Sequence, residues 1–244
     1  MEDVKHEVST AILVDGGFYR RRAFHYAGEK EPAERADELF NFCIGLLWDK
    51  YEKRNLYRIF YYDCPPSEKV VYNPVTKRQI DLKKSPQYQW TMDFYQELRR
   101  KRKLAIRLGT LADSNLSYSL TADAFKKLMR GDLSPQELTE NDIKLDIKQK
   151  GVDMRIGIDI ASLAFKKQVQ QIILVAGDSD FVPAAKQARR EGIDFILAPM
   201  GATIRPDLFE HIDGLIGKIL RLDDAQVQSN NLTDLSSTAT ENAG

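Results

Sequence analysis

The chain has 244 residues, and its 36 basic and 36 acidic side chains leave no formal net charge. A chain of this length forms one domain or two, and 43% hydrophobic residues suffice for an ordinary buried core. The balanced charge excludes a general positive field that would attract nucleic acid, so any basic patch must be local.

The two cysteines, Cys43 and Cys64, are too few for a disulfide framework or a four-cysteine zinc site. Because the sequence also lacks a secretory signal peptide, we expect packed free thiols and a cytoplasmic protein. No apolar run reaches the roughly 20 residues that a membrane span needs, so we expect no membrane association.

Five short segments rich in branched and aromatic residues predict strands. The first and the fourth contain AILVD and QIILVAG, which are almost entirely apolar, as in strands covered by helices on both faces. This pattern favours an α/β fold with a mostly parallel sheet. The predicted strands are Thr10 to Asp15, Leu56 to Asp63, Leu104 to Gly109, Gln171 to Gly177 and Ile193 to Pro199.

Helices are predicted between the strands, because apolar side chains there repeat every three or four residues. The first is expected from Glu31 to Arg54. A second begins at Ser85-Pro86, since serine is a good N-cap and proline favours the first helical turn. Two more are expected at Asp153 to Lys167 and at Asp180 to Arg190, with Gly192 closing the last one.

A long connection, residues 111–151, separates the third and fourth predicted strands. It contains two helical signals, Thr121 to Met129 and a capping box that begins at Ser134. We expect an inserted helical segment that acts as a subdomain or lid, since connections of this length are often functional. The polar stretch 223–244 lacks periodicity and is expected to be disordered, which leaves residues 1–222 as one domain.

Aspartates stand where open α/β sheets bind ligands, beyond the carboxyl ends of strands. Asp15 ends the first strand, Asp178 and Asp180 follow the fourth, and Asp153 begins a helix. If the first and fourth strands are parallel neighbours, these carboxylates converge and need a cation between them. Carboxylate oxygens suit Mg²⁺ or Mn²⁺. Each aspartate alone is equally compatible with a turn or a helix cap, but their combination favours a metal site.

Asp153 and Asp159 share one predicted helix but lie about 9 Å apart along it and about 120° apart around it. Asp153, at the helix start, is better placed to bind metal or orient water. Asp159 is expected either to support the metal ligands from outside the coordination sphere or to be structural. Asp63 ends the second strand, where it could equally cap the following turn, so we leave it outside the metal site.

Basic residues near the acidic motifs are candidates for contacts with phosphate. The basic run RRKRK at 99–103 is a weaker candidate, because cations at a helix end also complement the helix dipole. The candidates are Arg20, Arg21, Arg22, Lys150 and Arg155, and ordinary surface solvation is the alternative for each.

Motifs of several other chemistries are absent from the sequence. It has no nucleotide-binding glycine loop, no HExxH zinc motif and no serine-centred nucleophile elbow. No second aspartate follows two positions after Asp15, which weakens the case for an aspartyl-phosphate phosphatase.

With these motifs in view, the sequence resembles the NYN domain family, in particular its LabA-like branch, whose members share the PIN-like nuclease fold. The resemblance spans most of Ile12 to Leu222. It rests on VDGGF at 14–18, FYYDCPP at 60–66, IRLGTL at 106–111, KGVDMRIGIDIASLA at 150–164 and ILVAGDSDFVPAAKQARREG at 173–192. It implies a PIN-like three-layer sandwich with a Rossmann-like sheet. Many family members have asparagine three residues after the first-strand aspartate, where this chain has Phe18.

The resemblance also implies that Asp15, Asp153, Asp178 and Asp180 match the family's acidic metal centre. The implied function is hydrolysis of phosphodiester bonds with Mg²⁺ or Mn²⁺, and RNA is favoured over DNA by the resemblance alone. Asp153 would bind the metal or orient the attacking water. Two alternatives stay open: a catalytically weak nucleic-acid-binding or regulatory module, which Phe18 keeps open, and a metal-dependent phosphatase for small phosphate esters. A homo-oligomer is also left open.

Overall fold

The computed structural model describes residues 6–220, except for the side chains of residues 112–115 and 148–149. Its centre is a sheet of six parallel strands in the order β10-β9-β8-β1-β2-β5. All five predicted strands are confirmed, and the unpredicted β10 has only two residues, too few for a sequence pattern. The strands are β1 (His6–Asp15), β2 (Glu52–Asp63), β5 (Leu104–Leu108), β8 (Gln171–Val175), β9 (Asp194–Leu197) and β10 (Gly214–Leu215).

The strand order reverses beside β1. The chain runs from β1 to β2 and β5 on one side, and then returns to β8, β9 and β10 on the other side. Asp15 of β1 pairs with Tyr62 of β2, and Val14 pairs with Val175 of β8. The first and fourth predicted strands are thus parallel neighbours, which was the condition for the aspartates to converge, and the carboxyl ends of three strands meet at one edge.

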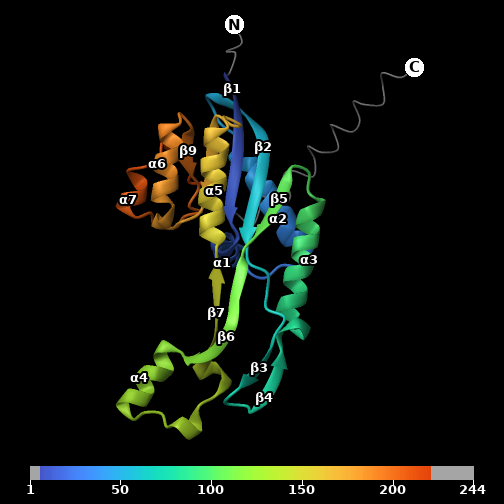
Figure 1. Cartoon of the computed structure of the whole chain (residues 1–244), viewed down its shortest axis with the longest axis vertical. Coiled ribbons are helices and arrows are strands. Elements are labelled where there is room, and N and C mark those ends of the chain that lie inside the picture. Colours follow the sequence, from blue (N-terminus) through green and yellow to red (C-terminus); the bar gives the residue numbers. More distant parts are fainter. Residues whose placement is uncertain (1–5, 221–244) are drawn as a thin grey trace, which may run out of the picture.

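Helices cover both faces of this sheet, as Figure 1 shows. Alternate residues of β1 pack to opposite sides: Ile12 and Val14 belong to one buried core, and Ala11 and Leu13 belong to the other. A strand buried on both faces must be apolar at every position, which explains the sequence AILVD. One face carries α1 (Gly16–Ala27), α2 (Pro32–Leu46) and α3 (Pro86–Arg100), and the other carries α5 (Val152–Phe165), α6 (Val182–Arg190) and the short α7 (Pro206–Phe209).

The first predicted helix was too long. α2 ends at Leu46, and the chain is extended from Glu52, because residues 52–63 pair with β1 along its whole length. Tyr51 continues the helical spacing in the sequence, yet it is exposed and lies outside the helix. The start of α3 is confirmed, since the Ser85 side chain accepts a hydrogen bond from the Tyr88 amide at 3.1 Å.

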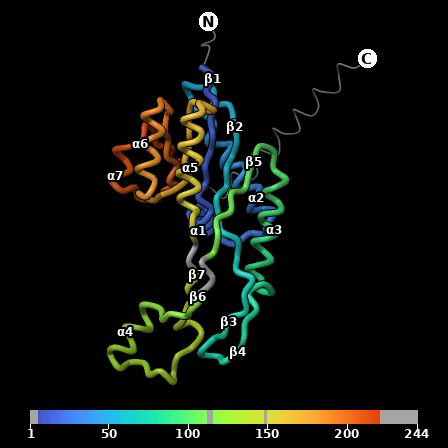
Figure 2. The backbone as a smooth tube through the Cα atoms, in the orientation of Figure 1, coloured from blue at the N-terminus to red at the C-terminus, as the bar shows by residue number. Residues whose placement is uncertain are grey.

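The inserted segment is an arm that extends from the carboxyl edge of the sheet (Figures 1 and 2). Its stalk is an antiparallel ribbon of β6 (Thr110–Leu120) and β7 (Ile143–Lys150). The predicted helical signals are present beyond the stalk, as α4 (Ala122–Arg130) and as a short turn at Pro135–Glu137 with its capping box. The segment is therefore not wholly helical, because its two flanks pair as strands.

A second antiparallel hairpin, β3 (Val70–Asn73) with β4 (Arg78–Asp81), lies between β2 and α3 and was not predicted. Cys43 and Cys64 are free and buried, as expected. Within residues 6–220, no helix combines the length and the apolarity that crossing a membrane requires. The predicted tail at 223–244 lies outside the described residues.

Candidate functional site

The carboxyl ends of β1 and β8 bring two of the predicted aspartates to the same edge of the sheet. Asp15 is the last residue of β1, and Asp178 lies three residues beyond the end of β8. Because Val14 pairs with Val175, the two strands end side by side. α5 begins at this edge, with Asp153 in its first turn (Figure 1). The structure therefore brings these aspartates to the same edge of the sheet.

Asp153 is the member of this group that interacts with all the others. Burial raises the pKa of its carboxyl, and the nearby charges of Asp178 and Asp180 raise it further. Burial also raises the pKa of Asp15, and the charges of Asp153 and Asp63 add to that rise. Mutual repulsion of this kind is relieved by a bound cation. We call Asp15, Asp153, Asp178 and Asp180 the acidic centre.

Two members of the acidic centre also have local structural roles. Asp15 is the N-cap of α1, where its Oδ1 accepts a hydrogen bond from the Phe18 amide at 3.1 Å. Asp178 caps the short turn Ser179–Phe181, where its Oδ1 accepts from the Asp180 amide at 3.2 Å. Each carboxylate thus uses one oxygen for the backbone. Among residues 6–220, the other oxygen of each carboxylate accepts no hydrogen bond and is available to a ligand.

The acidic centre is not a closed metal cage in this structure. Within residues 6–220, no three histidine, cysteine, aspartate or glutamate side chains are close enough to bind one metal ion together. Asp153, Asp178 and Asp180 are all exposed, so rotation of their side chains is not blocked by packing. Carboxylate oxygens are suitable ligands for a hard divalent cation. To bind one ion together, the side chains of Asp153, Asp178 and Asp180 would have to rotate toward one another.

Arg20 is committed to an ion pair and is not a free contact for phosphate. Its guanidinium donates two hydrogen bonds to Asp63, one of them from Nη2 to Oδ1 at 3.0 Å. Asp63 is buried and also accepts from the Tyr61 hydroxyl at 3.1 Å and from the Cys64 amide at 2.8 Å. Asp63 was not predicted to belong to the site. Its position at the end of β2, the strand that pairs with β1, could have indicated that it lies near Asp15.

The other two arginines of the run have different surroundings. Arg22 donates to the carbonyl oxygen of Met200 at 3.0 and 2.8 Å, and its guanidinium lies over the Tyr26 ring at 4.8 Å. Arg21 is exposed, and its charge lowers the pKa of Asp15. Arg20 and Arg22 thus already have partners within the described residues, whereas Arg21 is exposed near Asp15, and contact of the three arginines with phosphate stays a prediction.

Lys150 and Arg155 flank the start of α5, as the sequence indicates. Lys150 is the last residue of β7, and Arg155 is two residues beyond Asp153. Both side chains are exposed, and neither forms a salt bridge with another described residue. Their proposed contact with phosphate stays a prediction.

Asp159 has no direct part in the acidic centre. Its Oδ2 accepts a hydrogen bond from the Tyr62 hydroxyl at 2.7 Å and from Nε of Arg107 at 3.2 Å. Tyr62 belongs to β2 and Arg107 to β5, so this carboxylate ties α5 to two strands. Asp159 therefore ties the helix that carries Asp153 to the sheet, which is compatible with both the supporting and the structural role that the sequence left open.

Phe18 packs against the loop that carries Asp178. Its side chain is 9% exposed, and a Cβ atom built on Gly177 would lie 2.6 Å from Cε2 of the Phe18 ring. Only glycine fits at position 177, because the ring occupies the space of any side chain there. The ring joins the segment after β1 to the segment after β8 by packing alone.

The basic run at 99–103 lies at the opposite edge of the sheet, where α3 leads into the amino end of β5. Arg100 pairs with Glu97, Lys101 pairs with Asp37, and Lys103 donates to a backbone carbonyl. These three side chains therefore have partners within the chain, while a contact of the run with nucleic acid is untested.

Comparison with known protein families found one match. The NYN domain model matches residues 96–211, a segment that contains Asp153, Asp178 and Asp180 but begins after Asp15. No curated protein matches the chain. Among solved structures, the chain is similar to a Sir2 protein bound to a propionylated peptide, with a TM-score of 0.33 and 14% identity over 92% of this chain and 93% of that chain.

A sirtuin structure concerned with substrate affinity is similar at a TM-score of 0.31 and 13% identity, over 91% of this chain and 93% of that chain. Such scores carry no argument about function. Over residues 96–211, just under half of the chain, the sequence is similar to the NYN domain family.

Proposed function

We propose that the chain is a nuclease that hydrolyses phosphodiester bonds in RNA with a bound Mg²⁺ or Mn²⁺. The observation that carries the proposal is that Asp15, Asp178 and Asp180 lie near Asp153 where the strand order reverses. The NYN match supports a PIN-like nuclease and a nucleic-acid partner. The LabA-like branch, the preference for RNA and a cytoplasmic location belong to the proposal as expectations from the sequence.

The acidic centre fits a divalent metal by its chemistry. Asp15 and Asp178 would bind the ion through the carboxylate oxygens that their caps leave unused. Asp180 would complete the set, and Asp153 would bind the ion or accept a proton from the attacking water. When bound, Mg²⁺ or Mn²⁺ polarises the phosphate and lowers the pKa of a bound water.

The surrounding residues position this centre and the substrate. Arg21 would contact a phosphate oxygen beside Asp15, because its guanidinium is exposed and already close to that carboxylate. Asp159 holds α5 against the sheet and so holds Asp153 in place. The Phe18 ring keeps Gly177, and with it the Asp178 loop, next to the end of β1.

A cleavage assay tests the proposal. A labelled single-stranded RNA, the DNA of the same sequence and a chromogenic phosphate ester are each incubated with the full chain, with Mn²⁺ and with a chelator. We expect RNA cleavage that needs the metal and disappears in Asp153→Asn, while Arg99→Gln, altered at the opposite edge of the sheet, stays active.

The same assay separates the alternatives. Binding of RNA without cleavage at any metal concentration would support the regulatory module. Turnover of the phosphate ester alone would support the phosphatase. An Asp153→Asn protein that cleaves RNA as fast as the original chain would refute the acidic centre as the active site.

A further inference from the structure

A groove runs beside the carboxyl edge of the sheet, between α1, α2 and the first turns of α3. Its wider part, about 690 Å³, lies between the connection from α1 to α2 and the start of α3. Its narrower part, about 330 Å³, lies between residues 64–67, the start of α3 and the base of the arm. Arg20, Gln87 and Trp90 line both parts, so the two parts form one groove.

The groove begins next to the acidic centre but does not include it. Arg20, which lines both parts, donates to Asp63 at the end of β2. Asp15 ends the neighbouring strand β1, and paired strands lie about 4.8 Å apart. None of the four aspartates lines the groove. A ligand in the groove would thus lie beside a phosphate held at the acidic centre.

The groove contains an aromatic ring whose position is fixed. Trp90 stacks on Phe94 with the ring centres 5.1 Å apart and the planes at 18°. Its Nε1 donates to the carbonyl oxygen of Lys30 at 3.0 Å. The ring of Phe24, 59% exposed, lines the wider part. Fixed aromatic surfaces of this kind suit a flat aromatic ligand, and bases of single-stranded nucleic acids stack on them.

The basic side chains of the groove already have carboxylate partners. Arg20 pairs with Asp63, and both Lys30 and Arg35 pair with Glu38. These three are the basic residues that line the groove in the described part of the chain. A phosphate in the groove would therefore have to displace a carboxylate from each cation it used, so the groove is a poor site for phosphate.

Three exposed carboxylates of the groove are, in contrast, available. Glu29, Glu31 and Glu34 line the wider part, and none of them forms an ion pair with another described residue. A carboxylate accepts hydrogen bonds from amino groups of bases, as glutamate does from the amino group of cytosine. The exposed amide of Gln87 adds a donor and an acceptor.

We propose that this groove binds a nucleobase that carries an amino group, stacked on Trp90 with its amino group facing Glu29, Glu31 and Glu34. The base belongs to the single strand whose phosphate lies at the acidic centre, so this inference rests on the proposed function. Adenine, cytosine and guanine carry the amino group, and uracil lacks it. The groove would then favour strands with one of these bases next to the cleaved bond.

The two tryptophans of the chain provide a direct measurement. Trp48 is 80% exposed and lies near the start of β2, at the opposite edge of the sheet. In Trp48→Phe, only Trp90 emits, and in Trp90→Phe, only Trp48 emits. Each protein is titrated in chelator with oligocytidine, oligouridine and an abasic oligomer of the same length, so that cleavage plays no part.

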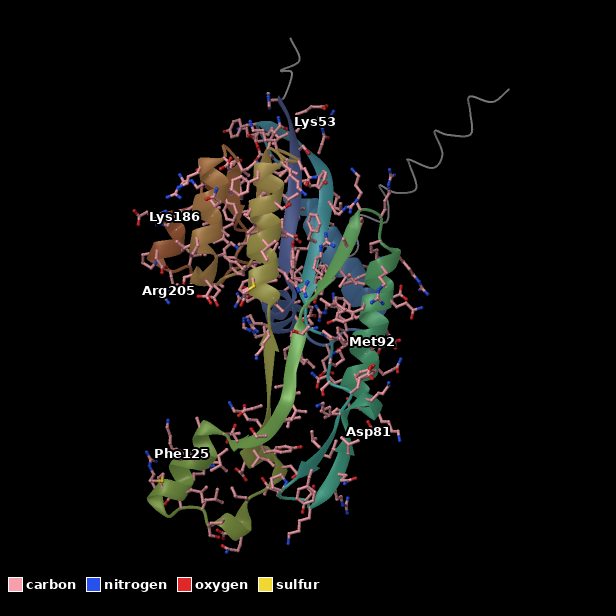
Figure 3. All side chains as sticks on the ribbon, in the orientation of Figure 1. Lys53, Asp81, Met92, Phe125, Lys186 and Arg205 are labelled. Atoms are coloured by element: carbon pink, nitrogen blue, oxygen red, sulfur yellow. The ribbon has the colours of Figure 1, made fainter. Side chains whose placement is uncertain are left out.

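We expect oligocytidine to quench Trp90 and to leave Trp48 unchanged. Oligouridine and the abasic oligomer should need about 10-fold higher concentrations, because neither offers the amino group. Phe24→Ala in the Trp48→Phe protein should weaken the binding of oligocytidine by about 10-fold. Phe125→Ala is the matched control, because this ring is 55% exposed and lies on α4 at the far end of the arm (Figure 3).

Several results would overturn the inference. Oligocytidine that leaves Trp90 unchanged, equal quenching by oligocytidine and oligouridine, or equal effects of Phe24→Ala and Phe125→Ala would each contradict it. Metal-dependent cleavage without quenching of Trp90 would refute base binding in the groove and still support the proposed function. Quenching without cleavage under any metal removes the proposed function and keeps the groove as a base-binding site.

Discussion

Replacing Asp153 with asparagine separates a metal ligand from a structural aspartate. Asp153 caps nothing, and burial together with the charges of Asp178 and Asp180 raises the pKa of its carboxyl. Its charge therefore destabilises the metal-free fold at neutral pH. Because the side chain is exposed and screened by solvent, we estimate the gain from Asp153→Asn at about 0.5 kcal/mol. For a chain of this size, that gain raises Tm by roughly 1 to 2 °C.

Mn²⁺ should stabilise the original chain much more than it stabilises Asp153→Asn. Mn²⁺ at 100 times its Kd stabilises the native state by about 2.7 kcal/mol, which raises Tm of the original chain by roughly 5 to 10 °C. In Asp153→Asn, most of that shift should be lost. The assay is thermal unfolding of both proteins with Mn²⁺ and with chelator.

Asp159→Asn is the matched control on the same helix. It weakens the hydrogen bonds from Tyr62 and Arg107, so it should lower stability by about 1 to 2 kcal/mol while the Mn²⁺ shift persists. If Asp153→Asn unfolds at a lower temperature than the original chain and still responds fully to Mn²⁺, Asp153 is structural and the reasoning is wrong.

Three further predictions concern the acidic centre and the residues beside it. Asp63→Asn should lower the unfolding free energy in urea by about 3 kcal/mol, because it breaks a buried pair with Arg20, and a loss below about 1 kcal/mol would contradict that. Arg21→Gln should weaken RNA binding and reduce its salt dependence, whereas Arg99→Gln should leave both nearly unchanged, and the reverse order would disprove the placement. Because the pKa of Asp153 is raised in the fold, its carboxyl contributes stability only at acidic pH. The Tm advantage of Asp153→Asn in chelator should therefore be absent near pH 3 and appear as pH rises to about 6.

The strands of the sheet could be predicted from the sequence because the pattern that identifies each strand lies within the strand itself. AILVD and QIILVAG are apolar at every position, as strands between two helical layers must be, and both form central strands. Once those two strands are neighbours, Asp15 and Asp178 must meet at their carboxyl ends. The strands and the α/β class were therefore predictable from local pattern, whereas the pairing of β1 with β8, about 160 residues apart in the chain, was only a condition of the prediction.

The arm was not predictable in the same way. Its two stalk strands, Thr110–Leu120 and Ile143–Lys150, are separated by 22 residues, and polar side chains alternate along both. The alternation in LSYSL at 116–120 and IKLDI at 143–147 is typical of a half-buried strand, but it is a weaker signal than the continuous apolar run of a strand buried on both faces. Only the pairing of the two strands with each other defines it, and that pairing is invisible in either strand alone.

The run Arg20, Arg21 and Arg22 shows why neighbouring residues on a helix need separate explanations. Successive side chains of α1 point about 100° apart, so three adjacent arginines cannot face one phosphate together. Arg20 points to Asp63, and Arg22 points to Met200 on the far side. The partners of these two lie 43 and 178 residues away in the chain, beyond the reach of local pattern.

Phe18 changes how the acidic centre is positioned and leaves its carboxylates in place. An asparagine at this position would offer a polar contact beside Asp15, whereas the phenylalanine ring packs against Gly177 so closely that no Cβ fits there. The ring and the glycine therefore depend on each other: a smaller residue at 18 would leave a void beside the Asp178 loop, and a larger one at 177 would push that loop away. Asp15 caps α1 through the Phe18 amide, so its own orientation does not require a polar side chain at this position. Phenylalanine at position 18 thus lacks the polar group of an asparagine. Its ring instead packs the segment after β1 against the segment after β8, which carry Asp15 and Asp178.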